Sequence, residues 1–157
     1  MLIRKATTLD VPKMQQLINS FADRGELLPR SLNQLYEDIR DFYVAIEDEA
    51  IIGTAALHIN WEDLAEVKAL VVSEDYQGKG LGRKLVESCM EDARALGISR
   101  LFALTYKPDF FKKLGFEDVD KAALPHKVWT ECINCPKFPN CGESAVMTRI
   151  KRTGDKE

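Results

Sequence analysis

Three glycines, Gly78, Gly80 and Gly82, fall within five residues between a strand-like run and a helical pattern. Glycine permits positive φ and a close approach of the backbone, so successive N–H groups can turn towards one anion. The N-terminus of the helix that follows adds the positive end of its dipole. Residues 64–96 therefore predict a strand, an anion-binding loop and a helix. A flexible connector before a solvated helix face is the alternative interpretation.

Two other phosphate-binding loops have spacings that this segment does not match. A P-loop requires glycine, four residues and then Gly-Lys-Ser/Thr, and no glycine here meets that spacing. The dinucleotide fingerprint Gly-x-Gly-x-x-Gly would need a glycine where Arg83 stands, and it belongs after the first strand of a βαβ unit. The sequence disfavours both folds.

Hydrophobic periodicity along the chain predicts an alternation of strands and helices. We expect a helix between Thr7 and Gly25, and a second that starts at Ser31 with Gln34 in capping-box position. Polar residues 47–49 separate two strands of a hairpin. The order predicts a mixed α/β or α+β protein with helices packed on a central sheet. The expected strands are residues 1–6, 42–46, 51–59, 64–73, 98–105, 116–119 and 145–150, and the later helices are 80–95 and 109–114.

Length and charge narrow the classes of function. A chain of 157 residues has the length of one domain, and we assign residues 1–152 to it, with 120–143 as a cysteine-containing insertion and 153–157 as a flexible tail. The 22 basic and 25 acidic side chains argue against a nucleic-acid binder, which usually has a basic excess. No run approaches the ~20 apolar residues that cross a bilayer. We expect a cytoplasmic protein without a signal peptide.

Two motifs resemble one enzyme family. Gln77-x-x-Gly80-x-Gly82 resembles the pyrophosphate loop Gln/Arg-x-x-Gly-x-Gly/Ala of the GNAT superfamily of N-acetyltransferases. Residues 110–116, Phe-Phe-Lys-Lys-Leu-Gly-Phe, resemble its later motif, aromatic-aromatic-x-x-x-Gly-Phe. The order of expected elements matches from about residue 2 to residue 150. The resemblance implies a mostly antiparallel sheet that is splayed between its fourth and fifth strands, with helices on both faces.

The resemblance also implies acetyl-CoA as the cosubstrate, with no metal required for the transfer. Backbone groups of residues 70–72 would pair with the pantetheine arm as though it were an added strand. The N–H groups of residues 77–82 would hold the pyrophosphate. The residues expected to contact acetyl-CoA are Leu70, Val71, Val72, Gln77, Gly78, Lys79, Gly80, Leu81, Gly82, Arg83, Phe110 and Phe111.

Transfer to an amine needs a route for the amine proton and donors for the charge that develops. Glu66 is the candidate base, because its apolar neighbours predict partial burial, which would raise its pKa. An exposed strand carboxylate is the alternative. Many relatives have a tyrosine as general acid where this chain has Phe111, so that role does not carry over. Tyr106 is the substitute candidate for the acid. Two alternatives stay open: Tyr106 is a packing aromatic with a solvated hydroxyl, or the thiolate leaves without a dedicated acid.

Two basic residues point to an acidic substrate. Residues 27–31 and 124–129 resemble short, stand-alone amino-acid N-acetyltransferases of the N-acetylglutamate synthase type. Arg30 would then clamp a substrate carboxylate with its planar guanidinium, and Lys127 would neutralise a second one. A surface arginine at a helix entry and a solvated lysine are the alternatives.

The cysteines offer a metal site only as an alternative. Cys132 and Cys135 form a C-x-x-C pair that Cys141 and His126 would complete as a zinc set. Cys89 belongs to the apolar stripe of the helix over residues 80–95. Because only three cysteines lie together, we expect reduced structural thiols and no metal.

These features predict an acetyl-CoA-dependent enzyme that acetylates the α-amino group of a small amino acid. L-Glutamate is the first candidate, as in the first step of arginine biosynthesis, and L-glutamine is the second. The alternatives are the same fold acting on a polyamine, an antibiotic or a protein N-terminus, and a non-catalytic acyl-CoA-binding or metal-sensing module. We expect a small-molecule substrate, no nucleic acid and no membrane partner, and a homodimer stays an open option.

Overall fold

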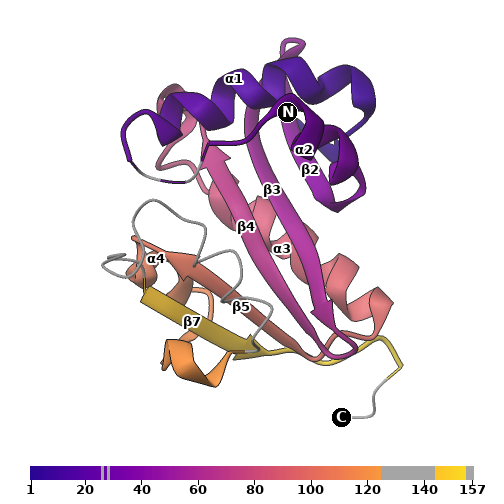
Figure 1. The fold of residues 1–157 in the computed structure, drawn as a ribbon, viewed down its shortest axis with the longest axis vertical. Coiled ribbons are helices and arrows are strands. Elements are labelled where there is room, and N and C mark those ends of the chain that lie inside the picture. The colour runs from indigo at the N-terminus through magenta and orange to yellow at the C-terminus, as the bar shows by residue number, and fades with distance from the viewer. Residues whose placement is uncertain (26, 28, 125–143, 155–157) are drawn as a thin grey trace. The chain divides into compact units, whose positions relative to one another are not determined.

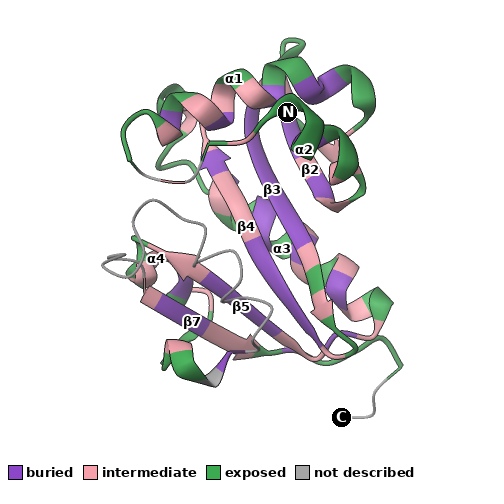
Figure 2. Ribbon diagram, viewed as in Figure 1, coloured by how far each residue is buried: buried purple, intermediate pink, exposed green. Residues whose placement is uncertain are grey.

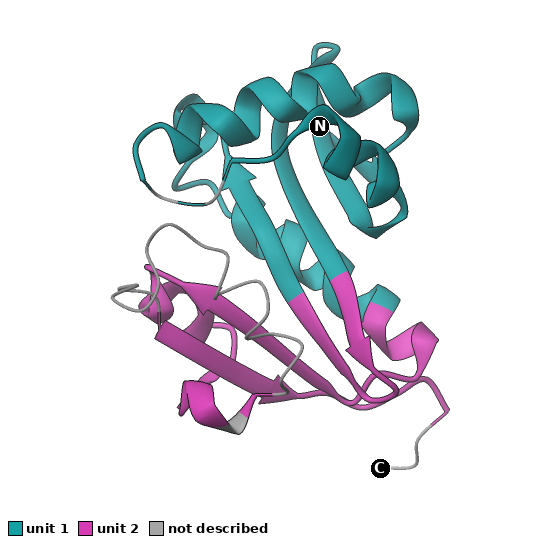
Figure 3. Cartoon of the chain, in the orientation of Figure 1, with its two compact units in different colours: residues 1–57, 67–92 teal, residues 58–66, 93–157 magenta. Residues whose placement is uncertain are grey.

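The computed structural model describes residues 1–25, 27, 29–124 and 144–154 (Figure 1). The chain forms two compact units, residues 1–57 with 67–92 and residues 58–66 with 93–157 (Figure 3). We call them unit 1 and unit 2. The strands join in one mixed sheet of order β1-β2-β3-β4-β5-β7-β6, in which β4 and β5 pair in parallel. The predicted mixed α/β class is confirmed.

The elements follow the predicted order, with short 3-10 turns added between them. The strands are β1 (Leu2–Lys5), β2 (Phe42–Glu47), β3 (Ala50–Trp61), β4 (Leu64–Val72), β5 (Arg100–Thr105), β6 (Glu117–Val119) and β7 (Ser144–Arg149). The α-helices are α1 (Val11–Ala22), α2 (Leu32–Glu37), α3 (Leu81–Leu96) and α4 (Pro108–Lys112). The 3-10 turns are η1 (Thr8–Asp10), η2 (Ile39–Asp41), η3 (Glu74–Tyr76) and η4 (Lys121–Ala123).

Unit 1 has helices on both faces of its strands, as the fold class requires. Side chains alternate between the two faces of a strand, so Phe42 and Val44 of β2 share one face. They form a buried cluster with the apolar stripes of α1 and α2. On the other face α3 packs so closely that a methyl group on Gly53 would lie 3.0 Å from Leu85 Cδ1. The purple band along β3 in Figure 2 marks the buried part of this strand. The α1–α2 cluster comprises Val11, Met14, Ile18, Phe21, Leu35, Phe42, Val44, Ala56 and Val71.

The helix ends in unit 1 have the local chemistry that the sequence predicts. The Gln34 N–H donates to Ser31 Oγ at 3.1 Å, and the Ser31 N–H donates to Gln34 Oε1 at 3.1 Å, so the capping box is confirmed. Gly25, three residues beyond the last residue of α1, has a φ of 76°. Glycine reaches this left-handed conformation without the steric cost of a Cβ, which fixes the end of the helix there.

Unit 2 is built around β5. The first residues of β4 pair with it in parallel, Leu64 opposite Arg100 and Glu66 opposite Phe102. On its other side β7 pairs antiparallel along the whole strand, and β6 pairs with β7. A buried cluster that includes Leu64 and Phe102 covers this part of the sheet.

Several predictions about organisation stay predictions. The single domain over residues 1–152 and the splay after the first pairs of β4 and β5 concern both units together. The proposed insertion lies largely outside the described residues. No helix in the described ranges is long and apolar enough to span a membrane.

Candidate active site

The end of β4 has one edge paired with β3 and one edge facing away from it. The Ser73 N–H donates to the Ile52 carbonyl at 2.8 Å, and the Val71 carbonyl oxygen would lie 3.2 Å from a methyl group on Gly53. Backbone groups of successive residues in a strand point to opposite edges. The groups of Leu70 and Val72 therefore point away from β3, whereas those of Val71 point towards it.

A strained residue precedes this edge. Ala69 has a φ of 52°, which is uncommon for a residue with a Cβ. The fully buried Thr54 donates its hydroxyl to the Ala69 carbonyl at 2.8 Å, which holds the irregular peptide in place. Ala69 stands between Glu66 and the outward-facing groups of Leu70 and Val72.

The glycine loop has the backbone conformation of an anion site. Gly78 and Gly80 have φ values of 78° and 83°, and no atom of the described residues lies within 4 Å of a Cβ built on either. Leu81 begins α3, whose first turn contains no acidic residue. The first N–H groups of a helix have no acceptor inside it, and the helix dipole favours an anion there. The loop therefore fits a pyrophosphate.

Side chains fasten this loop and modify its charge. Gln77 Nε2 donates to the Val72 carbonyl at 2.9 Å, which ties the loop to the outward edge of β4. The Lys79 ammonium lies 5.5 Å from the centre of the Tyr76 ring. Arg83 pairs with Glu87 at 3.1 Å on the exposed face of α3. Because Glu87 offsets the charge of Arg83, the backbone N–H groups and Lys79 are the stronger anion donors.

The two candidate acid–base residues lie in unit 2. Glu66 is 5% exposed, so the burial that its neighbours predict is present. It stands opposite Phe102, and Tyr106 follows β5 four residues beyond Phe102. At the rise of an extended strand this separation is about 13 Å. Tyr106 is 36% exposed. Their roles as base and acid stay predictions.

The aromatic pair of the later motif has two different environments. Phe111 is 4% exposed and makes edge-to-face contacts with Phe110 and Phe116, with ring centres 5.1 Å apart in each case. Its ring therefore belongs to the core of unit 2. Phe110 is half-buried, so it is the member of the pair whose ring has surface left for a ligand.

Arg30 is held from both its backbone and its side chain. Its N–H donates to Asn19 Oδ1 at 2.9 Å, and its carbonyl accepts from Asn19 and Gln15, each at 3.2 Å. The guanidinium carbon lies 6.0 Å from the centre of the Phe42 ring. The buried Nε has no hydrogen-bond acceptor in the described part of the chain. A donor left unsatisfied in this way is costly, so the side chain is ready for an anionic partner.

Comparison with known proteins places this chain in a family. The model of the acetyltransferase (GNAT) family matches residues 11–116. The chain belongs to the GNAT family. It is an acetyl-CoA-dependent N-acetyltransferase, and the family membership that the two motifs predict is confirmed.

Three relatives show which proteins this GNAT enzyme is similar to. It is 35% identical over 148 residues to an uncharacterized N-acetyltransferase of Chlorobaculum tepidum, covering 94% of this chain and 96% of that protein. It is 33% identical over 132 residues to an amino-acid acetyltransferase of Mycobacterium tuberculosis, covering 82% and 75%. N-acetylglutamate synthase from Neisseria gonorrhoeae, solved with coenzyme A and N-acetyl-glutamate, matches with 30% identity and a TM-score of 0.89. That match covers 96% of this chain and 35% of the gonococcal chain.

Some predicted site residues of this GNAT enzyme fall outside the described residues. These are Lys127 and the alternative zinc set Cys132, Cys135, Cys141 and His126. The described ranges contain no group of three or more His, Cys, Asp or Glu side chains that could hold a metal ion. Cys89 is fully buried in unit 1, as its place in the apolar stripe predicts.

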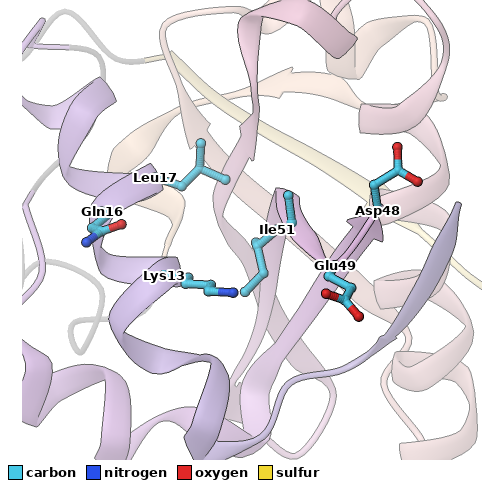
Figure 4. A pocket seen from close by; sticks show the side chains of 7 residues that line it. Lys13, Gln16, Leu17, Asp48, Glu49 and Ile51 are labelled. Carbon is cyan, nitrogen blue, oxygen red and sulfur yellow. The ribbon is translucent and has the colours of Figure 1, made fainter.

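Unit 1 also contains a pocket that the sequence does not indicate. It has a volume of about 610 Å³ and lies between α1 and the β2–β3 turn (Figure 4). Lys13, Gln16 and Leu17 line it from α1, and Asp48, Glu49, Ala50 and Ile51 line it from the hairpin. None of the predicted site residues is among these lining residues.

Proposed function

We propose that this GNAT enzyme acetylates the α-amino group of a small amino acid, with L-glutamate as the first candidate and L-glutamine as the second. The buried Nε of Arg30, which has no acceptor among the described residues, carries this proposal. An arginine fork pairs well with a carboxylate, and a carboxylate is common to all α-amino acids. The amino-acid acetyltransferase and N-acetylglutamate synthase names of the relatives support the same class of substrate.

The acetyl-CoA part of the proposal rests on unit 1. The outward groups of Leu70 and Val72 offer a strand edge to the amides of the pantetheine arm. The loop at residues 78–82 offers N–H donors to the pyrophosphate. Within the predicted set, we assign the pairing to Leu70 and Val72 and leave Val71 to the ladder with β3. Acetyl-CoA, when bound, supplies a thioester whose carbonyl carbon accepts the amine.

The chain's own residues handle the protons. The amine nitrogen forms a bond to the acetyl carbon while the carbon–sulfur bond breaks, and the amine proton passes to the Glu66 carboxylate directly or through one water. The departing sulfur takes a proton either from Tyr106 or from solvent. Glu66 is 5% exposed, and a buried carboxylate that reaches the amine directly or through one water can serve as the general base.

Thiol release from acetyl-CoA with each of the twenty amino acids tests the substrate. A reaction without acceptor serves as the control. We expect turnover with glutamate or glutamine well above the control. If all twenty are silent, the proposed substrate class is wrong, and polyamines are the next acceptors to assay.

The pH profile of Glu66→Gln tests the base. The variant keeps the size of the side chain and removes its ability to accept a proton as a carboxylate. We expect a fall in kcat of about 10²-fold or more and loss of the acidic limb of the kcat/KM profile. An unchanged profile would remove Glu66 from this role. Tyr106→Phe, measured in parallel, loses the basic limb only where the tyrosine hydroxyl donates the proton.

A further inference from the structure

The residue that carries the substrate proposal does not lie in a helix or a strand. Arg30 precedes Ser31, the N-cap of α2, in the connection between α1 and α2. A residue in a connection has no ladder or helix of its own to fix its backbone. The direction of its guanidinium therefore depends on what its N–H and carbonyl groups contact.

Two side chains of α1 make those contacts. Asn19 pairs with both peptide groups of Arg30, since Oδ1 accepts from its N–H at 2.9 Å and Nδ2 donates to its carbonyl at 3.2 Å. Gln15 donates to the same carbonyl at 3.2 Å. Gln15 and Asn19 are four residues apart, so they lie on one face of α1. Together they provide hydrogen-bond partners for the backbone N–H and carbonyl groups of Arg30, as a neighbouring strand would.

The helix that carries these amides is itself firmly placed. Met14 and Ile18, the neighbours of Gln15 and Asn19, are fully buried in the core cluster. Phe42, over whose ring the guanidinium lies, is part of the same cluster. The backbone and the side chain of Arg30 are thus fixed against one rigid body, with a buried Nε still lacking an acceptor among the described residues.

We propose that Asn19, assisted by Gln15, is a positioning residue that sets the affinity of this enzyme for its amino-acid substrate. This inference rests on the proposed function, in which Arg30 binds the substrate carboxylate. Asn19 touches neither substrate nor acetyl-CoA in this scheme. It acts by holding the Arg30 peptide, so that the guanidinium is already aimed before the carboxylate arrives.

The test compares Michaelis constants for the two substrates in Asn19→Leu, Gln15→Leu and Arg30→Ala. Asn19→Leu removes two hydrogen bonds to Arg30, and we expect it to raise the KM for the amino acid by about tenfold. Gln15→Leu removes one and raises it by roughly threefold. The KM for acetyl-CoA stays within about twofold in both variants. Gln16→Leu is the matched control, because Gln16 is an exposed glutamine of the same helix and the described hydrogen bonds of Arg30 are with Gln15 and Asn19.

A double variant separates positioning from a general loss of structure. In the Arg30→Ala background, Asn19→Leu has nothing left to position, so we expect no further rise in the KM for the amino acid. Multiplicative effects of the two substitutions would overturn the inference. So would a rise in both Michaelis constants together, because that pattern indicates a disturbed fold.

The outcomes also distinguish this inference from the proposed function. If Arg30→Ala raises the KM and Asn19→Leu does not, the positioning role fails and the carboxylate clamp survives. If Arg30→Ala has no effect on the KM for the amino acid, the positioning role of Asn19 and the carboxylate clamp of Arg30 both fail. For a preparation that turns over no amino acid, calorimetry of L-glutamate binding in the presence of coenzyme A replaces KM. Absence of binding by the unmodified chain then overturns both proposals.

Discussion

Replacement of Gly53 by alanine should destabilise unit 1 by a magnitude that its contacts define. The added methyl group would lie 3.0 Å from Leu85 Cδ1, 3.2 Å from the Val71 carbonyl oxygen and 3.5 Å from the Ala45 Cβ. The first atom belongs to a side chain that can rotate, whereas the second is backbone and cannot yield without moving β4. Overpacking of this kind costs roughly 1–3 kcal/mol. For a chain of this size, each kcal/mol lowers Tm by about 2–4 °C.

Thermal and urea unfolding measure this loss, and Leu85→Val provides the matched partner. The shorter side chain removes the 3.0 Å contact but leaves the Val71 contact. We expect the double variant to be less destabilised than the sum of the single variants by at least about 0.5 kcal/mol. We also expect Gly53→Ala alone to raise the KM for acetyl-CoA, because the moved strand carries the outward groups of Leu70 and Val72. Strict additivity, or a neutral Gly53→Ala, would refute the close packing of α3 on β3.

Three further predictions concern single residues of unit 1. Arg4 donates a hydrogen bond to the Asp10 carboxylate at 2.7 Å, which holds the pKa of Asp10 below its usual value. This pair therefore stabilises the fold at pH values above the ordinary carboxyl pKa. The contribution disappears as the pH falls through the lowered pKa. Asp10→Asn should therefore cost roughly 1–3 kcal/mol of unfolding free energy at pH 7 and progressively less below about pH 4. A difference in unfolding free energy between the variant and the unmodified chain that does not change with pH would contradict the assignment. Glu49 has a φ of 65° in the β2–β3 turn, so Glu49→Gly should raise the urea midpoint, gaining roughly 0.5–1 kcal/mol. The control Ala50→Gly, at the first residue of β3, should lower that midpoint. Burial raises the pKa of Cys89 to about 12, so iodoacetamide at pH 8 should label Cys89 in the urea-unfolded chain only, as peptide mapping would detect.

Local signals in the sequence predict the elements of this fold well, because the residues that end and cap helices act on their near neighbours. The Ser31–Gln34 capping box and the glycine stop at Gly25 are examples. Helix α2 is shorter than its apolar stripe predicts: it ends at Glu37, and Ile39 reaches the core from the 3-10 turn η2 instead. Periodicity identifies the side chains that face the core but does not distinguish one helical geometry from another.

The parts of the candidate site that the sequence misses depend on contacts distant along the chain. Alanine carries no signal for positive φ, and the φ of Ala69 is accommodated by a hydroxyl from Thr54 on another strand. Likewise, no spacing rule connects Asn19 with Arg30, whose pairing follows from the way the core packs α1. The burial of Glu66, in contrast, could be predicted, because its immediate neighbours in the strand are apolar.

The order of strands in unit 2 has a consequence for synthesis on the ribosome. Strand β7 lies between β5 and β6 in the sheet, although it follows both in the chain. Until β7 has been translated, β5 keeps an unpaired edge and β6 has no partner along its own edge. A nascent chain that stops before Ser144 therefore presents an open strand edge to other chains. The last strand to be made is thus the one that closes this edge of β5, whatever the enzyme acetylates.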